Sequence, residues 1–282
     1  MRIIDFRLRP PALGFLSSRI YAAPENRDSY TRRLGFSPVI SAQKLSMDLL
    51  FQEMDAAGIT TGVAVGRTTA TLGSIPNADI AEIVATHPRH FAGAGSVDPL
   101  RRREALSELE AMRKAGLRAV NIEPGVLAPA TYMDDRRLYP FYAWCEDNRF
   151  PVIVMSGGGA GPDITYSAPE HIDRVLADFP ELTIVSSHGN WPWVHEILSI
   201  AFRRPNLYLC PDMYWPRLPG SEDYTRAANS FLSERMLFGT AYPFCPLVEY
   251  VNWFTALPIA PAAMENILWR NAARVLNLDT QT

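Results

Sequence analysis

Eight short, β-rich apolar runs recur along the chain, and longer segments with helical spacing separate most of them. Segments such as "SMDLLFQEMDAAG", "NADIAEIVATHP", "RRREALSELEAMRKAG" and "LYPFYAWCEDN" repeat apolar residues at the spacing of one helix face. Strands that alternate with helices are parallel and buried on both faces. Eight such units predict an α/β fold, a single (β/α)8 TIM barrel. The runs cover residues 3–6, 62–66, 91–97, 117–122, 152–155, 182–187, 207–210 and 236–239.

Chain length and glycine patterns favour the barrel over an open doubly wound sheet. The 282 residues are close to the roughly 250 residues that one such barrel uses. No G-x-G-x-x-G follows the first strand, and no Walker-type phosphate loop occurs. Gly58 and Gly116 stand where a glycine commonly ends a helix. We therefore expect one domain, 1–282, with a long irregular loop at about residues 10–41 over the C-terminal mouth of the barrel.

Composition argues against several function classes. The net charge of −3 and the pI near 6.0 lack the excess of positive charge that is typical of proteins that bind nucleic acid. No apolar run reaches the roughly 18 residues of a membrane span, and no secretion signal opens the chain, so we expect a cytoplasmic protein. Cys145, Cys210 and Cys245 are widely spaced and odd in number, which predicts reduced thiols rather than disulfides or a zinc ribbon.

The opening stretch "MRIIDFRLRP" puts two cations on one face of a strand. Residues two apart in an extended chain point the same way, so Arg7 and Arg9 would project together. Like charges in that arrangement repel unless water or an anion separates them. The residues alone leave two interpretations open: a basic edge strand with solvated arginines, or a pair that meets an anion.

Five motifs, in order along nearly the whole chain, resemble those of the amidohydrolase superfamily, in its amidohydrolase-2 branch. "IIDFRLR" is similar to I-D-x-H-x-H, "FPVIVMSGG" to P-V-x-x-H-x-G, and "SSHGNWPWVHEIL" to G-H-x-G before a helix. "MLFGTAYPF" is similar to F-G-[ST]-D-x-P, and "NILWRNAARVLNL" to the closing N-A-x-R-x-[LF] helix. The resemblance implies a barrel with a metal at its C-terminal mouth, held by two histidines of strand one, histidines of strands five and six, and the aspartate of strand eight.

The sequence departs from this ligand set at four positions. Arg7 and Arg9 stand in place of the strand-one histidines, Met155 in place of the strand-five histidine, and Ala241 in place of the aspartate. Only His188 remains. Arginine has no lone pair to donate, methionine suits soft metals, and alanine has no donor. We therefore expect no conventional metal cofactor, and the aspartate that acts as general base in related hydrolases is absent too.

Two guanidinium groups at the mouth would replace a dication in position and in charge. Arginine binds planar carboxylates and phosphates through two parallel hydrogen bonds. The sequence therefore predicts that Arg7 and Arg9 hold an anionic group of a small, carboxylated substrate. In the alternative, they neutralise the internal acids Asp5, Glu123 or Asp212 in the vacated metal cavity.

Catalytic groups in this fold come from the ends of strands. His188, after the sixth strand, is the candidate acid or base at neutral pH. Glu123 and Asp212 follow the fourth and seventh strands, where each is a candidate for proton transfer or for pairing with an arginine.

Three further residues are candidates for substrate binding. Ser156, which opens "SGGGAG", offers a hydroxyl beside backbone N–H groups of the kind that stabilise an oxyanion. Tyr214 and Tyr242 are expected to close the pocket or donate a hydrogen bond, with aromatic packing as the alternative.

Three functions remain open at this point. The first is a metal-independent hydrolase of C–O or C–N bonds, including lactones, acting on a small carboxylated substrate. The second is a lyase of the decarboxylase or hydratase type, with a rebuilt zinc site at His188, Glu123 and Asp212. The third is a non-catalytic barrel that binds a small anion. Neither nucleic acid nor membrane is an expected partner. A homo-oligomer is expected only by analogy with the family that the sequence resembles.

Overall fold

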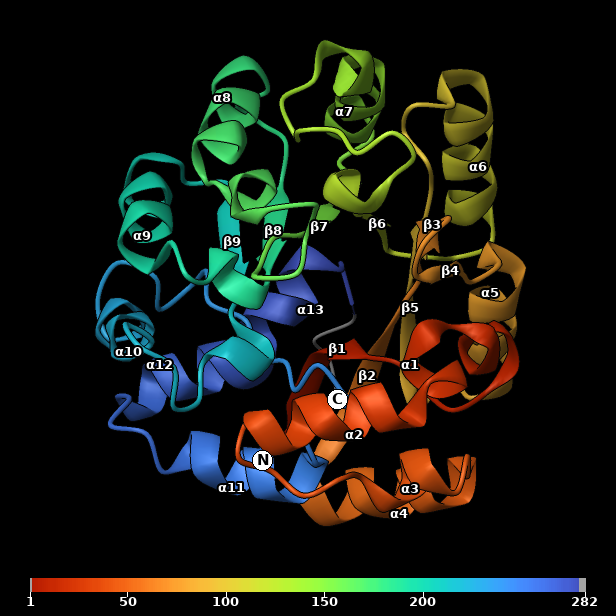
Figure 1. Cartoon of the computed structure of the whole chain (residues 1–282). Helices are drawn as coiled ribbons and strands as arrows, with labels where there is room; N and C mark the ends of the chain where they lie inside the picture. Colours follow the sequence, from red (N-terminus) through yellow and green to blue (C-terminus); the bar gives the residue numbers. More distant parts are fainter. Residues whose placement is uncertain (1, 279–282) are drawn as a thin grey trace.

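The computed structural model describes residues 2–278, so Met1 and residues 279–282 of the predicted domain lie outside the described residues. Seven parallel strands form one curved sheet in the order β1-β2-β5-β6-β7-β8-β9, with helices packed around it (Figure 1). The predicted α/β barrel is therefore confirmed. The strands are β1 (Ile3–Leu8), β2 (Ile59–Val65), β5 (Phe91–Ser96), β6 (Ala119–Ile122), β7 (Val152–Met155), β8 (Ile184–Ser187) and β9 (Leu207–Cys210), with a small hairpin of β3 (Thr68–Thr69) and β4 (Gly73–Ser74) after β2.

The helices follow the predicted segments and end where glycines allow it. Ser46 accepts a hydrogen bond from the Leu49 N–H at the start of α4, and Gly58 ends that helix with φ 72°. The helices are α1 (Arg19–Ala22), α2 (Pro24–Arg33), α3 (Ile40–Gln43), α4 (Met47–Ala57), α5 (Asn77–Thr86), α6 (Arg102–Lys114), α7 (Tyr139–Asp147), α8 (Glu170–Asp178), α9 (Val194–Arg203), α10 (Glu222–Ala228), α11 (Leu247–Thr255), α12 (Pro261–Glu265) and α13 (Asn271–Val275).

The predicted eighth strand, residues 236–239, is not a regular strand, yet its backbone closes the barrel. On one side the Leu237 N–H donates to the carbonyl of Leu209 in β9 (2.8 Å). On the other side the Phe6 N–H of β1 donates to the Phe238 carbonyl (2.9 Å), and Arg9 N–H to the Tyr242 carbonyl (3.2 Å). Too few consecutive ladder bonds form for a strand, but the first and last elements of the barrel are joined.

Residues 10–41, predicted as an irregular loop, instead contain α1, α2 and the first residues of α3. We call this segment the N-terminal cover. Helix α2 crosses in front of β1 and β2 in Figure 1. It begins with a proline, which suits the first turn of a helix, but the residues that it buries are Arg27 and Thr31. A helix without an apolar stripe has no hydrophobic period, so the spacing of apolar residues could not reveal it.

Hydrogen bonds between Asp5 and Thr240 join the first strand to the segment that closes the barrel. Asp5 is fully buried within β1, and its carboxylate accepts hydrogen bonds from the Thr240 N–H (3.0 Å), the Thr240 hydroxyl and the Arg7 N–H (3.0 Å). Burial raises the pKa of Asp5 to about 6, and the bonds from Thr240 and Arg7 only partly oppose that rise. Asp5 thus ties β1 to the closing segment while holding a proton more tightly than an ordinary carboxyl.

The raised pKa of Asp5 should make the free energy of unfolding fall as pH rises. Between the ordinary pKa of 3.8 and about 6, the folded protein binds more protons than the unfolded chain, so its free energy of unfolding falls as pH rises through that window. The loss is roughly 3 kcal/mol for a shift of about two units. Asp5→Asn cannot lose this proton and should flatten the slope.

Urea unfolding at about pH 4 and about pH 7 measures the effect, with Asp55→Asn, an exposed acid on α4, as the matched control. Wild type and the Asp55 variant should lose the same stability between the two pH values, and the Asp5 variant clearly less. Equal losses in all three proteins would contradict the raised pKa.

Candidate functional site

A cavity of about 380 Å³ opens at the carboxyl ends of the strands, under the N-terminal cover. Its wall combines residues that directly follow strands, such as Arg9, Arg67 and His188, with residues of α1 and α2 such as Tyr30. Among the described residues that line it, arginines and His188 are the ones that can carry charge, and no carboxylate is present. Apolar side chains, Met213 and Phe244 among them, complete the wall. Such a cavity suits a small anionic ligand that also has an apolar part.

His188 and Asp212 form a buried pair beside this cavity. The His188 Nδ1 lies 2.8 Å from Asp212 Oδ1, and a carboxylate only accepts, so the Nδ1–H donates and Nε2 keeps its lone pair. Burial lowers the pKa of His188, assisted by the Arg7 charge and opposed by Asp212. At neutral pH His188 is therefore a neutral base with its ring orientation fixed by Asp212.

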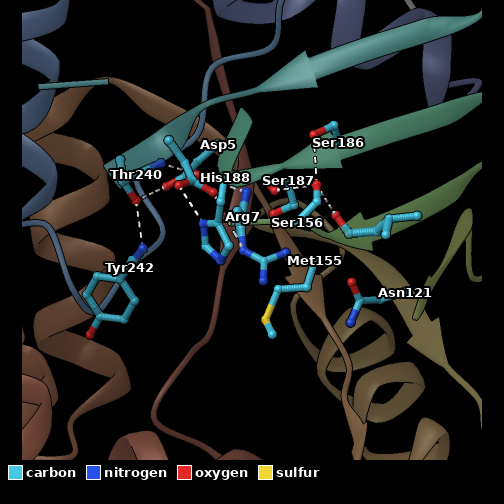
Figure 2. A network of polar contacts seen from close by, with 12 residues as sticks. Asp5, Arg7, Asn121, Met155, Ser156, Ser186, Ser187, His188, Thr240 and Tyr242 are labelled. Atoms are coloured by element: carbon cyan, nitrogen blue, oxygen red, sulfur yellow. Dashed lines mark hydrogen bonds and ion pairs between the residues drawn. The ribbon is translucent and has the colours of Figure 1, made fainter. Parts of the chain in front are cut away.

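Arg7 lies directly behind this pair and has few direct partners. Its side chain is 1% exposed, and Figure 2 shows it between His188 and Met155. Its Nε is 3.7 Å from Asp212 Oδ2, and none of its guanidinium nitrogens has a hydrogen-bond partner among the described residues. Burial lowers the pKa of Arg7, and the Asp212 charge opposes that shift. Asp212 thus faces His188 with one oxygen and Arg7 with the other.

Arg67, which the sequence analysis missed, neutralises Glu123. Its Nε lies 3.0 Å from both carboxylate oxygens of Glu123, and its Nη2 contacts the Met155 sulfur at 3.7 Å. Burial acts to raise the pKa of Glu123, but the charges of Arg67, Arg7 and Arg9 outweigh it, so the pKa lies below its usual value. A carboxylate held this way is a counter-ion and a poor proton carrier. Arg67 directly follows a predicted strand, which is the signal that could have found it.

Arg9 is a buried cation in the wall of the cavity. It is 3% exposed and lines the cavity, and its Nη1 has no hydrogen-bond partner among the described residues. Burial and the nearby charges of Arg7 and Arg67 lower its pKa. The ion pairs found among the described residues join Arg7 and Arg67 to carboxylates but do not include Arg9.

The other predicted binding residues have different surroundings. Tyr214 lines the cavity, stacks on Trp191 with ring centroids 5.4 Å apart, and its hydroxyl meets that of Tyr30 at 2.5 Å. Tyr242 instead meets the Ser41 hydroxyl at 2.8 Å beneath the N-terminal cover. Ser156 is not among the residues that line the cavity: its hydroxyl contacts the Ser186 hydroxyl (2.8 Å) and the Ser187 carbonyl (3.1 Å), while Gly157 and Gly159 of the same loop line the cavity.

The residues at the mouth do not fit the metal-ligand set that the resemblance implies. Among residues 2–278, no group of three or more His, Cys, Asp and Glu side chains could hold a metal ion. The alternative zinc site at His188, Glu123 and Asp212 is not formed, because Glu123 is bound by Arg67.

No helix within the described part of the chain is both long and apolar enough to cross a membrane.

Solved structures share this architecture over almost the whole chain. An uncharacterized TIM-barrel protein from Bordetella bronchiseptica is 60% identical, with a TM-score of 0.97 and 99% of each chain covered. A 2,6-dihydroxybenzoate decarboxylase from Rhizobium is 16% identical, with a TM-score of 0.72 and coverage of 99% of this chain and 98% of the other. A dihydroxybenzoic acid decarboxylase from Polaromonas sp. JS666, with bound manganese and the inhibitor 2-nitroresorcinol, is 17% identical, with a TM-score of 0.67 and coverage of 98% and 96%. No curated protein matches the sequence.

These structures overturn the expectation that no metal cofactor is involved. Besides the Polaromonas enzyme, two structures of 5-carboxyvanillate decarboxylase from Novosphingobium aromaticivorans contain manganese, so proteins with this fold do bind a metal. The sequence profile of the amidohydrolase family matches residues 9–278. With that match and the 60% identical barrel, the chain belongs to the amidohydrolase family.

Proposed function

We propose that the cavity binds a small aromatic carboxylate with a neighbouring hydroxyl, and that the protein is a lyase that releases the carboxyl group as CO2. The observation that carries the proposal is the arginine-lined cavity of about 380 Å³ beside the neutral His188. Fold relatives that are decarboxylases of hydroxylated benzoates support the lyase alternative over the predicted hydrolase.

The substrate oxygen that Arg9 binds can be inferred from how charge moves during decarboxylation. The departing carboxylate loses its negative charge, so a guanidinium bound to it would stabilise the substrate more than the transition state. The hydroxyl oxygen gains charge when its proton leaves. Arg9, whose buried Nη1 has no hydrogen-bond partner among the described residues, therefore binds this oxygen. The leaving carboxylate faces the apolar part of the cavity wall, which includes Met213.

His188 would both take up and deliver the proton that moves in the reaction. Its Nε2 takes the phenolic proton and returns it to the ring carbon that carries the carboxylate. The carbon–carboxyl bond then breaks, its electron pair restores the aromatic ring, and CO2 leaves beside a phenolate product. Asp212 stabilises the transient imidazolium through Nδ1 (2.8 Å), as an orienting carboxylate does in other histidine-based sites.

The first prediction concerns His188. His188→Ala should lower CO2 release by about 100-fold or more, the usual size of a general acid-base contribution. Wild-type activity should fall on acidification at a pH below 6.5, because burial lowers the pKa of His188 from that value. CO2 release from 2,6-dihydroxybenzoate and salicylate is measured with and without added manganese, because relatives hold that metal.

His195→Ala is the matched control for this experiment. His195 is also paired with an aspartate, Asp223 (2.7 Å), but its side chain is 78% exposed on α9. The control should keep full activity. Normal turnover in His188→Ala would remove His188 from the mechanism, and binding without CO2 release in wild type would favour the anion-binding barrel.

The second prediction separates the two arginines of the opening strand. Arg9→Met should keep the fold and weaken salicylate binding by roughly ten- to one-hundred-fold, the effect of losing a charged hydrogen bond. Arg7→Met leaves the buried Asp212 without its nearest guanidinium and should lower the free energy of unfolding by about 3–5 kcal/mol. Calorimetric titration and chemical unfolding of both variants measure these effects. Unchanged affinity in Arg9→Met would show that the ligand is bound elsewhere.

A further inference from the structure

Arg27 is a second buried cation of the cavity, and it comes from a different element. It lies on α2 of the N-terminal cover, is 3% exposed and lines the same cavity as Arg9. Whereas Arg9 follows β1 in the barrel wall, Arg27 approaches the ligand space from the helices above it. The two guanidinium groups therefore reach the cavity from separate parts of the fold.

Two nitrogens of the Arg27 guanidinium have hydrogen-bond partners, and the third has none among the described residues. Its Nε donates to Asp28 (2.8 Å), and its Nη1 reaches the Ala42 carbonyl at 3.4 Å. The ring of Tyr21 lies 5.8 Å below the guanidinium carbon, which restricts its plane. Its Nη2 is buried and has no hydrogen-bond partner among the described residues. An unpaired buried donor is unfavourable, so this nitrogen points to a ligand group that is present during function.

Charge at the cavity entrance favours an anionic group at this position. Arg19 and Arg33, both exposed, line the cavity beside Arg27. Among residues 2–278, the carboxylate bonded to Arg27 is that of Asp28, which engages it through one nitrogen and does not line the cavity. Cations gathered at an entrance attract anions over distances of about 10 Å at ordinary ionic strength.

We propose that Arg27 determines specificity by binding an acidic group other than the departing carboxylate, so that the preferred ligand is an aromatic ring with one acidic group at Arg9 and a second at Arg27. This inference rests on the proposed function, in which Arg9 already binds one anionic oxygen. The ring would lie between the two cations, against the aromatic side chains of Tyr30, Tyr214 and Phe244. A ring with one acidic group would leave Arg27 Nη2 unpaired and bind more weakly.

Benzoate and isophthalate test this idea because they differ only in the second carboxylate. Wild type should bind isophthalate about tenfold or more tightly than benzoate, the gain expected from one charge-assisted hydrogen bond. Arg27→Met should abolish that preference and change benzoate affinity less than about threefold. Arg32→Met, an exposed arginine of α2 that does not line the cavity, should keep the preference. Calorimetric titration measures all six affinities.

Each other outcome overturns the proposal. A wild type without preference, an Arg27→Met protein that keeps it, or equal weakening of both ligands would show that Arg27 does not bind a second acidic group. If Arg27→Met fails to fold, Arg27→Lys replaces it: the single ammonium should lose most of the preference, and full retention would count against the proposal. Binding does not require turnover, so a preference without CO2 release would refute the lyase and leave this inference standing.

Discussion

Positive charge that is buried at the barrel mouth controls how the rest of this structure is arranged. Arg7, Arg9 and Arg67 are each at most 7% exposed, and guanidinium groups so placed repel one another unless negative charge lies close by. Asp212 and Glu123 supply two negative charges, and each of them faces one of the arginines. No ion pair among the described residues joins the third cation, Arg9, to a carboxylate. In the proposed function, a bound anion supplies the negative charge that faces this cation.

Asp212 links this charge balance to the chemistry. One of its oxygens orients His188, the other faces Arg7, and its backbone carbonyl accepts a bond from the Tyr250 hydroxyl (2.5 Å). His188 and Asp212 also adopt left-handed backbone conformations, with φ 67° and 42°, which are unfavourable outside glycine. Strain of this kind persists only where surrounding contacts enforce it. The mouth is thus organised before a ligand arrives, as electrostatic catalysis requires.

The sequence predicted the elements better than it predicted the partners of their side chains. Seven of the eight runs are strands, because apolar runs alternating with helices have few other solutions. The polar helix α2 was missed since it has no apolar stripe. His188 lies at the site because its motif places it at a strand end. That Glu123 pairs with Arg67 rather than with Arg7 or Arg9 depends on side-chain geometry across neighbouring strands, and no linear pattern contains it. The segment at 236–239 closes the barrel without regular pairing.

That closure has a consequence for how the protein is made. The bond between Asp5 and Thr240 joins residues 235 positions apart, so β1 meets its second neighbour only after most of the chain has left the ribosome. Bringing such distant segments together is entropically unfavourable and slow. Until then, one edge of β1 and one edge of β9 expose unpaired backbone groups, which can associate with other chains. Incomplete chains would therefore be prone to aggregate late in synthesis, and the loss of the closing segment would leave an aggregating half-barrel rather than a smaller stable protein.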